Sequence, residues 1–143
     1  MKRLRAESDG IVFGFTSRNA RTYKSMNYHR VKIKSGKTLW AKAVSVPDEA
    51  DFFEVSDEKI WKCNDNNYWW VSHNATRVVG ELGERIAFFP YCDNHPGPWH
   101  GYPVSPANDV HYEVPEEVVS TWEAGNTPWI DDLVAGRIRK GKI

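Results

Sequence analysis

The sequence predicts a single α+β domain, with short antiparallel strands in its first two thirds and a pair of helices at its end. Apolar runs rich in β-branched and aromatic residues recur between residues 11 and 91, separated by turn-forming residues. Two segments with helical periodicity follow only after Pro106, joined by glycine and asparagine. Strands followed by helices indicate a mainly antiparallel, twisted sheet of roughly five to seven short strands, with a C-terminal αα-hairpin packed against it.

Length and composition fit one globular domain over residues 1–143. A chain of 143 residues has the size of a single domain. The hydrophobic fraction of 41% and the charged fraction of 27% exclude an intrinsically disordered chain, which has too few apolar residues to form a core. The two basic ends, residues 1–10 and 137–143, are candidates for flexible segments.

Charge is unevenly distributed, although the formal net charge is zero. The first 42 residues contain eleven Lys or Arg and two acidic residues, whereas residues 43–135 contain four Lys or Arg and seventeen acidic residues. The overall balance excludes nucleic-acid binding through net charge alone. A local basic surface remains compatible with an anionic partner.

The first third of the chain is expected to form a strand, a loop and a β-hairpin. Residues 11–15 (IVFGF) predict a strand, and the polar residues 17–27 predict a loop. Residues 28–46 give the clearest local pattern, because apolar residues alternate with basic or aromatic residues on both sides of a Ser-Gly-Lys turn. Strict alternation would place a row of side chains on the outward face, namely Arg30, Lys32, Lys34, Trp40 and Lys42.

The middle of the chain predicts an aromatic hairpin and one further strand. Residues 47–58 are acidic and centred on two phenylalanines, which indicates a short helical turn or a loop. Residues 59–63 and 68–71 flank an Asn-Asp-Asn-Asn turn and predict the hairpin. Residues 74–80 fit either a short helix or a strand. Residues 84–91 predict a strand that leads into a proline-rich segment.

Two short helices are expected at the end of the chain. Pro115, followed by two glutamates, marks the start of the first helix, and Gly125 with the asparagine after it marks the end. Pro128 begins the second helix, and Gly136 is expected to end it before a basic tail. The predicted core draws on all these elements and consists of Val12, Phe13, Val31, Ile33, Leu39, Trp61, Trp69, Ile86, Phe88, Val118, Trp122 and Leu133.

Residues 91–106 (YCDNHPGPWHGYPVSP) are the stretch most indicative of function. They hold four of the eight prolines, which exclude a helix or a central strand. Loops of this kind carry function more often than the elements they connect. Together with the basic hairpin, this segment predicts a non-enzymatic binding protein for an anionic ligand, which is a nucleotide, a nucleic-acid strand or a phosphorylated small molecule.

The residues of this predicted site divide by their chemistry. Lysine and arginine contact phosphate, aromatic rings stack on bases or other rings, and an imidazole forms a hydrogen bond. In that order the candidates are Arg30, Lys32 and Lys34, then Trp40, Trp99 and Tyr102, then His100. The solvated outer face of an edge hairpin shows the same pattern of exposed lysines.

A small hydrolase is the first alternative. His95 or His100 would act as a general base or as a metal ligand, with Asp93 beside it. Cys92 is a further candidate ligand, but the spacing matches none of the strong metal-binding motifs. The same residues are also typical of a loop held down by a buried cysteine and packed rings. No metal or cofactor is therefore expected.

A protein that neutralises a toxin or binds a host factor is the second alternative. The acidic residues of segment 48–54 and of the closing helices would attract a basic protein partner. Neutralisation of the basic first third within the fold accounts for the same acidic residues.

The compartment is expected to be the cytoplasm. Two cysteines without a secretory signal indicate a reducing environment. No apolar run approaches the length of a transmembrane helix, so no membrane partner is expected.

Overall fold

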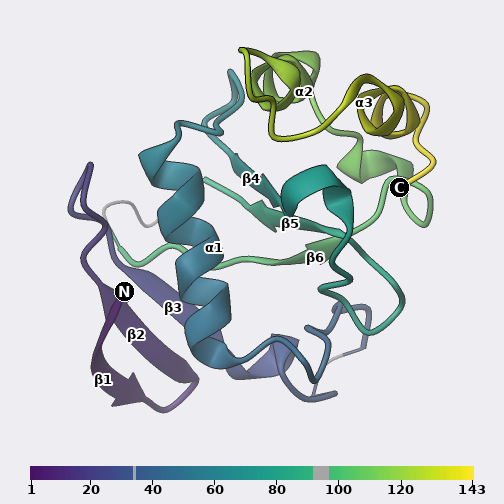
Figure 1. Ribbon diagram of the computed structural model, residues 1–143. Coiled ribbons are helices and arrows are strands. Elements are labelled where there is room, and N and C mark those ends of the chain that lie inside the picture. The colour runs from purple at the N-terminus through teal and green to yellow at the C-terminus, as the bar shows by residue number, and fades with distance from the viewer. Residues whose placement is uncertain (34, 92–96) are drawn as a thin grey trace.

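The computed structural model describes residues 1–33, 35–91 and 97–143 and confirms the α+β class (Figure 1). Within these ranges the strands are β1 (Lys2–Glu7), β2 (Gly10–Gly14), β3 (Tyr23–Met26), β4 (Tyr68–Val71), β5 (Ile86–Phe89) and β6 (Tyr102–Val104). The α-helices are α1 (Val46–Glu58), α2 (Glu116–Glu123) and α3 (Asp132–Arg139). Three 3-10 turns complete the elements, η1 (Asn27–His29), η2 (His73–Ala75) and η3 (Val110–Tyr112).

The strands form two antiparallel sheets rather than the single sheet expected. In the described residues, one sheet has the order β1-β2-β3 and the other the order β4-β5-β6. A parallel bridge between Tyr23 and Trp99 joins them. There the Lys24 N–H donates to the Trp99 carbonyl at 2.6 Å, and the Trp99 N–H donates to the Thr22 carbonyl at 2.9 Å. The chain then continues directly into β6, so the proline-rich segment connects the two sheets.

Helix α1 begins at a well-formed cap. The Ser45 side chain accepts a hydrogen bond from the Asp48 N–H, and the Asp48 carboxylate accepts one from the Ser45 N–H, so two free helix donors are satisfied. The sequence indicated only a short turn or a loop here. A helix was missed because Glu49 and Asp57, eight residues apart on one helical face, are both fully buried, so the buried face shows no apolar periodicity.

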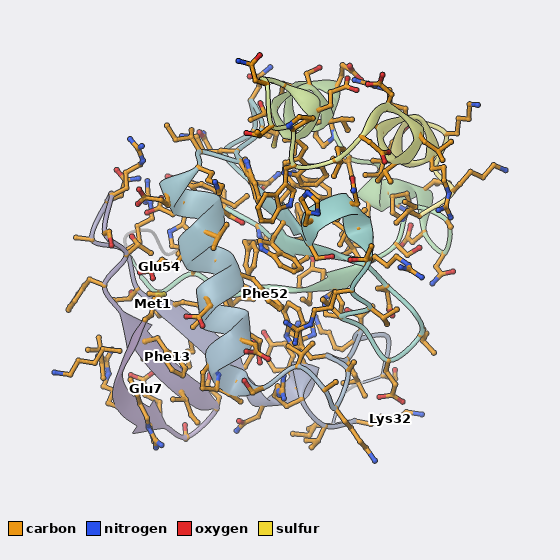
Figure 2. All side chains as sticks on the ribbon, viewed as in Figure 1. Met1, Glu7, Phe13, Lys32, Phe52 and Glu54 are labelled. Carbon is orange, nitrogen blue, oxygen red and sulfur yellow. The ribbon has the colours of Figure 1, made fainter. Side chains whose placement is uncertain are left out.

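The aromatic rings of α1 hold both sheets. Phe53 contacts Tyr23 of β3 at 5.6 Å and Phe89 of β5 at 5.4 Å between ring centroids. Phe52 stacks on Trp70 of β4 at 3.8 Å. Figure 1 shows α1 lying alongside both sheets, and Figure 2 shows the Phe52 ring directed to the interior. A single helix therefore packs against strands from two separate sheets.

The C-terminal part of the chain covers the other face of the second sheet. Side chains alternate along a strand, so Phe88 points away from α1, and its ring contacts Tyr112 at 5.5 Å. The Trp129 indole donates a hydrogen bond to the Val71 carbonyl at 2.7 Å. Helices α2 and α3 pack together as the predicted pair, and Arg139 pairs with Glu116 and Glu123 across them.

The chain ends differ from the expected helix and tail. Helix α3 begins at Asp132 behind the cap Asp131 and continues through Gly136 to Arg139. Gly136 therefore does not end the helix, and Ile138 is buried. At the other end, the basic residues 2–7 form the edge strand β1.

The described residues of segment 28–46 do not form the predicted hairpin. The described residues there form η1 and irregular chain, with an isolated bridge from Trp40 to Gly80. Val31 and Ile33, expected in the core, are 54% and 63% exposed. Trp40, expected on the outward face, is only 3% exposed and packs against Phe52. Alternation over five residues on each arm is a local signal, and the tertiary packing of Trp40 overrides it.

Some of the remaining local predictions are confirmed and others are wrong. The strands expected at 11–15 and 84–91 appear as β2 and β5, and the aromatic hairpin appears as a short contact, in which Lys62 pairs with Tyr68. Strand β3 lies inside a segment predicted to be a loop. Of the predicted core, Leu133 is also exposed and Leu39 and Phe88 are half-buried, whereas the buried members are Val12, Phe13, Trp61, Trp69, Ile86, Val118 and Trp122. No helix in the described ranges has the length and apolarity needed to cross a membrane.

Two identical substitutions test this distribution of burial. Ile86 is fully buried, so Ile86→Ala should lower the free energy of unfolding by about 2–5 kcal/mol. Ile33 is 63% exposed, so Ile33→Ala should change it by less than about 0.5 kcal/mol. Urea denaturation of the two variants measures both values. Comparable losses of unfolding free energy in the two variants would contradict the exposure of Ile33 and favour the buried position that the predicted hairpin gave it.

Candidate functional site

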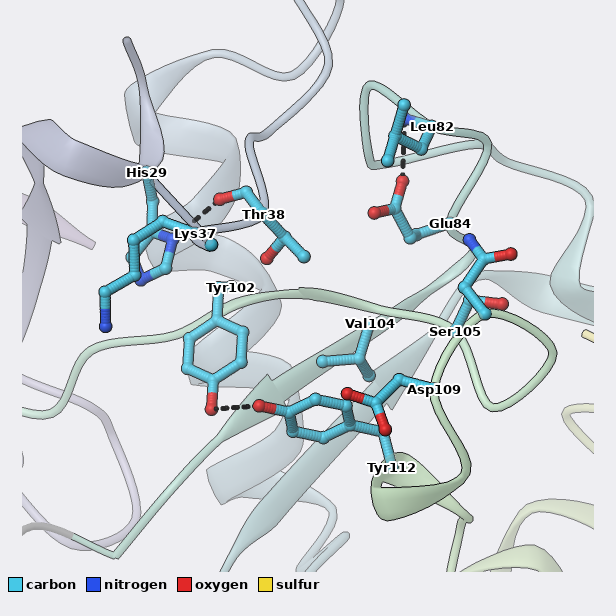
Figure 3. A pocket seen from close by; sticks show the side chains of 12 residues that line it. His29, Lys37, Thr38, Leu82, Glu84, Tyr102, Val104, Ser105, Asp109 and Tyr112 are labelled. Carbon is cyan, nitrogen blue, oxygen red and sulfur yellow. Dashed lines mark hydrogen bonds between the residues drawn. The ribbon is translucent and has the colours of Figure 1, made fainter. Parts of the chain in front are cut away.

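A pocket of about 190 Å³ lies where four segments of the chain meet (Figure 3). His29 of η1 and residues 36–38 form one wall, and residues 82–84 form a second. Residues from the range 102–112 supply the rest of the lining. Part of the basic first third and part of the proline-rich segment therefore both line this pocket.

Backbone contacts bring these segments together. The Glu81 N–H donates to the Leu39 carbonyl at 2.9 Å, beside the bridge from Trp40 to Gly80. This contact places the 82–84 turn next to the 36–38 loop. Strand β6 enters the pocket because it pairs with β5, the central strand of the second sheet.

Arg30 is committed to a buried ion pair rather than directed into the pocket. Its guanidinium lies 3.0 Å from the Glu49 carboxylate and donates to the Val44 carbonyl at 2.6 Å. Tyr23 and Ser25 also donate to Glu49, at 2.9 and 2.8 Å. Because Glu49 is fully buried, removing Arg30 would leave this carboxyl without its only charged partner in the described chain, which burial makes costly. Arg30 therefore has a structural partner in place of the expected phosphate.

The two tryptophans expected to stack on a ligand are buried. Trp40 and Trp99 are 3% and 2% exposed. The Trp99 ring contacts Phe53 and Tyr68, at 5.5 and 5.1 Å between centroids, and so belongs to the core. These burials correct the expectation of an open aromatic platform.

The other predicted residues are distributed unevenly around the pocket. Tyr102 lines it, and His100 lies close enough to Lys37 for the lysine charge to act on its pKa. Lys32 is exposed and extends away from the body of the protein (Figure 2). Lys34, like Asp93 and His95 of the hydrolase alternative, lies outside the described residues.

His29 is held in one tautomer beneath the pocket. Its Nδ1 lies 2.7 Å from the Thr38 carbonyl, an acceptor, so Nδ1 carries the proton and donates, and Nε2 is left as an acceptor. The ring stacks on Tyr102 at 4.8 Å. Burial lowers the pKa of His29 to about 4, and burial together with the Lys37 charge lowers the pKa of His100. Both imidazoles are therefore neutral at pH 7.

Lys37 is the cation of the pocket lining. Its ammonium lies 5.4 Å from the centroid of the Tyr28 ring. No carboxylate of the described residues lies within 4.0 Å of it, whereas Lys24, Arg77 and Arg139 each have such a partner. Lys37 therefore presents a charge that the described protein leaves unpaired.

Hydroxyl groups line the remaining walls. The Tyr102 and Tyr112 hydroxyls form a hydrogen bond of 3.1 Å, and burial raises the pKa of Tyr102, so its phenol stays neutral. The Thr38 Oγ1 is buried and has no hydrogen-bond partner in the described part of the chain. Such groups can orient a polar ligand, and the two rings supply apolar area.

Comparison with known proteins adds no constraint. Neither protein-family models, nor curated proteins, nor solved structures give a match to this chain. Among the described residues, no group of three or more His, Cys, Asp or Glu side chains is arranged to hold a metal ion.

Of the residues that line this pocket, the sequence prediction named only Tyr102, and those it missed include Lys37, Thr38, Glu84 and Tyr112. Lys37 was assigned to a turn, and Glu84 to the start of a strand. The loop contact between Glu81 and Leu39 that assembles the pocket joins distant segments and carries no local signal. Only the unusual density of rings near residue 100 pointed to this region.

The pKa of His29 predicts a loss of stability in acid. Between pH 6.5 and 4 the unfolded chain binds a proton at this residue that the folded protein excludes, so the free energy of unfolding falls as the pH falls. The loss attributable to His29 is at most about 3 kcal/mol. His29→Asn keeps a side-chain donor for Thr38 and should flatten this part of the pH dependence, measured by urea denaturation at several pH values. His111→Asn, at a side chain 87% exposed, is the matched control, and parallel curves for wild type and His29→Asn would contradict the assignment.

Glu49 predicts a dependence of opposite sign. Burial raises its pKa from 4.5 to about 7. The stability that its protonated form contributes is complete below pH 4.5 and is lost as the pH rises to about 7, by up to about 3 kcal/mol. Glu49→Gln should remove this decline, whereas Glu58→Gln, at an exposed position of the same helix, should retain it. A decline that persists in Glu49→Gln would show that another group causes it.

Proposed function

We propose that this protein binds a small anionic ligand, with the anionic group seated at Lys37 in the pocket between residues 36–38 and 102–112. The observation that carries the proposal is the unpaired ammonium of Lys37 among the described residues, next to two neutral imidazoles. By contrast with Lys37, most cations near buried acids already form an ion pair, as Arg30 does with Glu49. In the described chain, the Lys37 ammonium is the only charged group of the pocket wall formed by His29 and residues 36–38. A phosphate or carboxylate bound there would pair with it.

The imidazoles favour the same ligand. The Lys37 charge and burial oppose protonation of His100, and burial opposes protonation of His29. An anion beside these rings reverses the electrostatic part of that penalty, because an opposite charge stabilises the protonated form. Binding should therefore take up protons and become tighter as the pH falls from 7 toward 5.

The size of the pocket favours a small molecule over a nucleic-acid strand. Its volume of about 190 Å³ is below the roughly 300–1,000 Å³ that is typical of sites for drug-sized ligands. Binding of a single strand normally uses exposed rings on which bases stack, and Trp40 and Trp99 are buried. A phosphorylated small molecule, or the phosphate end of a nucleotide, fits this space better.

The acidic surface supports the second alternative less well. Asp48 pairs with Arg77, Asp51 with the N-terminal amine, and Glu116 with Arg139. Each of these acids already has a cationic partner within the fold. Internal neutralisation therefore accounts for much of the acidic charge, and a basic protein partner has fewer free carboxylates to contact.

Titration with ethyl phosphate, followed by NMR, tests the proposal. Backbone amide signals of residues 36–38 should shift, and Lys37→Met should weaken binding by about tenfold or more, as loss of a charged hydrogen bond does. Lys32→Met, which removes an exposed lysine outside the pocket lining, is the control and should leave the affinity unchanged. Equal weakening by the two variants would indicate diffuse surface charge and would overturn the proposed site, as would the absence of any shift.

A further inference from the structure

Glu84 is a buried carboxylate in the wall of the pocket opposite Lys37. The residue is only 2% exposed. Gly80 allows this position, because a Cβ at Gly80 would overlap the Glu84 carboxylate. The carboxylate is therefore packed directly against the Gly80 backbone.

Only one oxygen of this carboxylate is used by the fold. The Oε1 atom accepts a hydrogen bond from the Leu82 N–H at 2.8 Å. The Oε2 atom has no hydrogen bond within the described chain, and Figure 3 shows it directed into the pocket on the side of Thr38. The residue as a whole is buried, but this oxygen is not among the solvent-excluded unpaired atoms, so it is open to the pocket and positioned to receive a donor from a ligand.

Other buried carboxylates of the protein show what Glu84 lacks. Glu49 and Asp57, both fully buried, pair with Arg30 at 3.0 Å and with Arg21 at 3.2 Å. No Lys, Arg or His among the described residues lies within 4.0 Å of Glu84. Glu84 is therefore the buried carboxylate of the described residues that has no cationic partner, and a cationic group entering the pocket would supply one.

The surroundings of Glu84 suit an ammonium group. The Tyr102 and Tyr112 rings line the same pocket, and aromatic faces attract cations. The Thr38 Oγ1, which has no partner in the described residues, can accept a second hydrogen bond. The other acid of the lining, Asp109, is exposed and already accepts from the His111 ring at 2.9 Å, so it is the weaker candidate.

We propose that Glu84 is a second recognition point in this pocket and binds an ammonium group of the ligand, so that the ligand is a small zwitterion with its anionic group at Lys37. The zwitterionic nature of the ligand rests on the proposed function, whereas the cation subsite at Glu84 stands on its own geometry. Lys37 and Glu84 lie on different walls of the pocket (Figure 3), so the two groups of the ligand must be separated by a spacer.

Two matched series of ligands test this inference. Alkyl phosphates with two to five methylene groups supply the anion alone, and ω-aminoalkyl phosphates of the same lengths add only the ammonium. For at least one length the amine should raise the affinity by about tenfold, the effect of one charged hydrogen bond. Glu84→Gln keeps the acceptor for Leu82 and should abolish that gain, while the affinity for the plain alkyl phosphate stays within about twofold. Asp109→Asn, at the exposed acid of the lining, should retain the gain.

The outcomes separate this inference from the proposed function. Alkyl phosphates that bind through Lys37, with no gain from the amine at any length, would overturn the Glu84 subsite and leave anion binding in place. A gain that survives in Glu84→Gln, or that is lost in Asp109→Asn, would also overturn it. If alkyl phosphates fail to bind, titration with the matching alkylamines decides the subsite, because shifts of residues 82–84 that disappear in Glu84→Gln would support it and their absence would overturn it.

Discussion

The packing of one face of α1 across two sheets is the constraint on which the rest of this fold depends. Phe53 contacts β3 and β5 through Tyr23 and Phe89, so a single ring joins elements of both sheets. Glu49 and Asp57 lie four residues to either side of it and are fully buried, each with an arginine partner. Each carboxylate must keep its arginine partner, because removing one partner of a buried ion pair costs about 3–5 kcal/mol.

This constraint reaches the pocket through Arg30. The guanidinium joins Glu49 to the Val44 carbonyl and so fixes the chain immediately after η1. His29, one residue earlier, is thereby held with its ring on Tyr102. The position of the pocket wall thus follows from a buried ion pair made by the central helix, and the most basic part of the sequence serves packing as well as charge.

The sequence was informative where burial and apolar character coincide. Strand β2, strand β5 and the closing pair of helices were predicted because their buried positions carry Val, Ile, Phe or Trp at the expected spacing. Prediction failed where the two properties separate. Glu49 and Asp57 are polar and buried, so α1 was overlooked, while Val31 and Ile33 are apolar and exposed, so a hairpin was predicted that is absent. Neither case can be recognised without knowing the tertiary partners.

The candidate site stays a prediction, and only the positions of its residues can be compared with the structure. Lys37 of the basic first third and Tyr102 of the proline-rich segment both line one pocket. The individual assignments of Arg30, Trp40 and Trp99 did not anticipate their burial or pairing. Glu84 was not predicted as a site residue because its position depends on Gly80, which has no side chain and so makes room for the carboxylate. In the sequence, Gly80 resembles an ordinary turn residue.

The parallel bridge between Tyr23 and Trp99 delays the completion of the fold during synthesis on the ribosome. The open edge of β3 is met by a residue near position 99, and the helix that covers it is made only after residue 46. The first three strands are therefore synthesised before the segment that pairs with β3. Such distant pairing slows folding, since a long loop must close before the contact forms. Until then the edge of β3 has no strand partner, while the opposite edge of the sheet, β1, carries like charges that disfavour pairing with other chains.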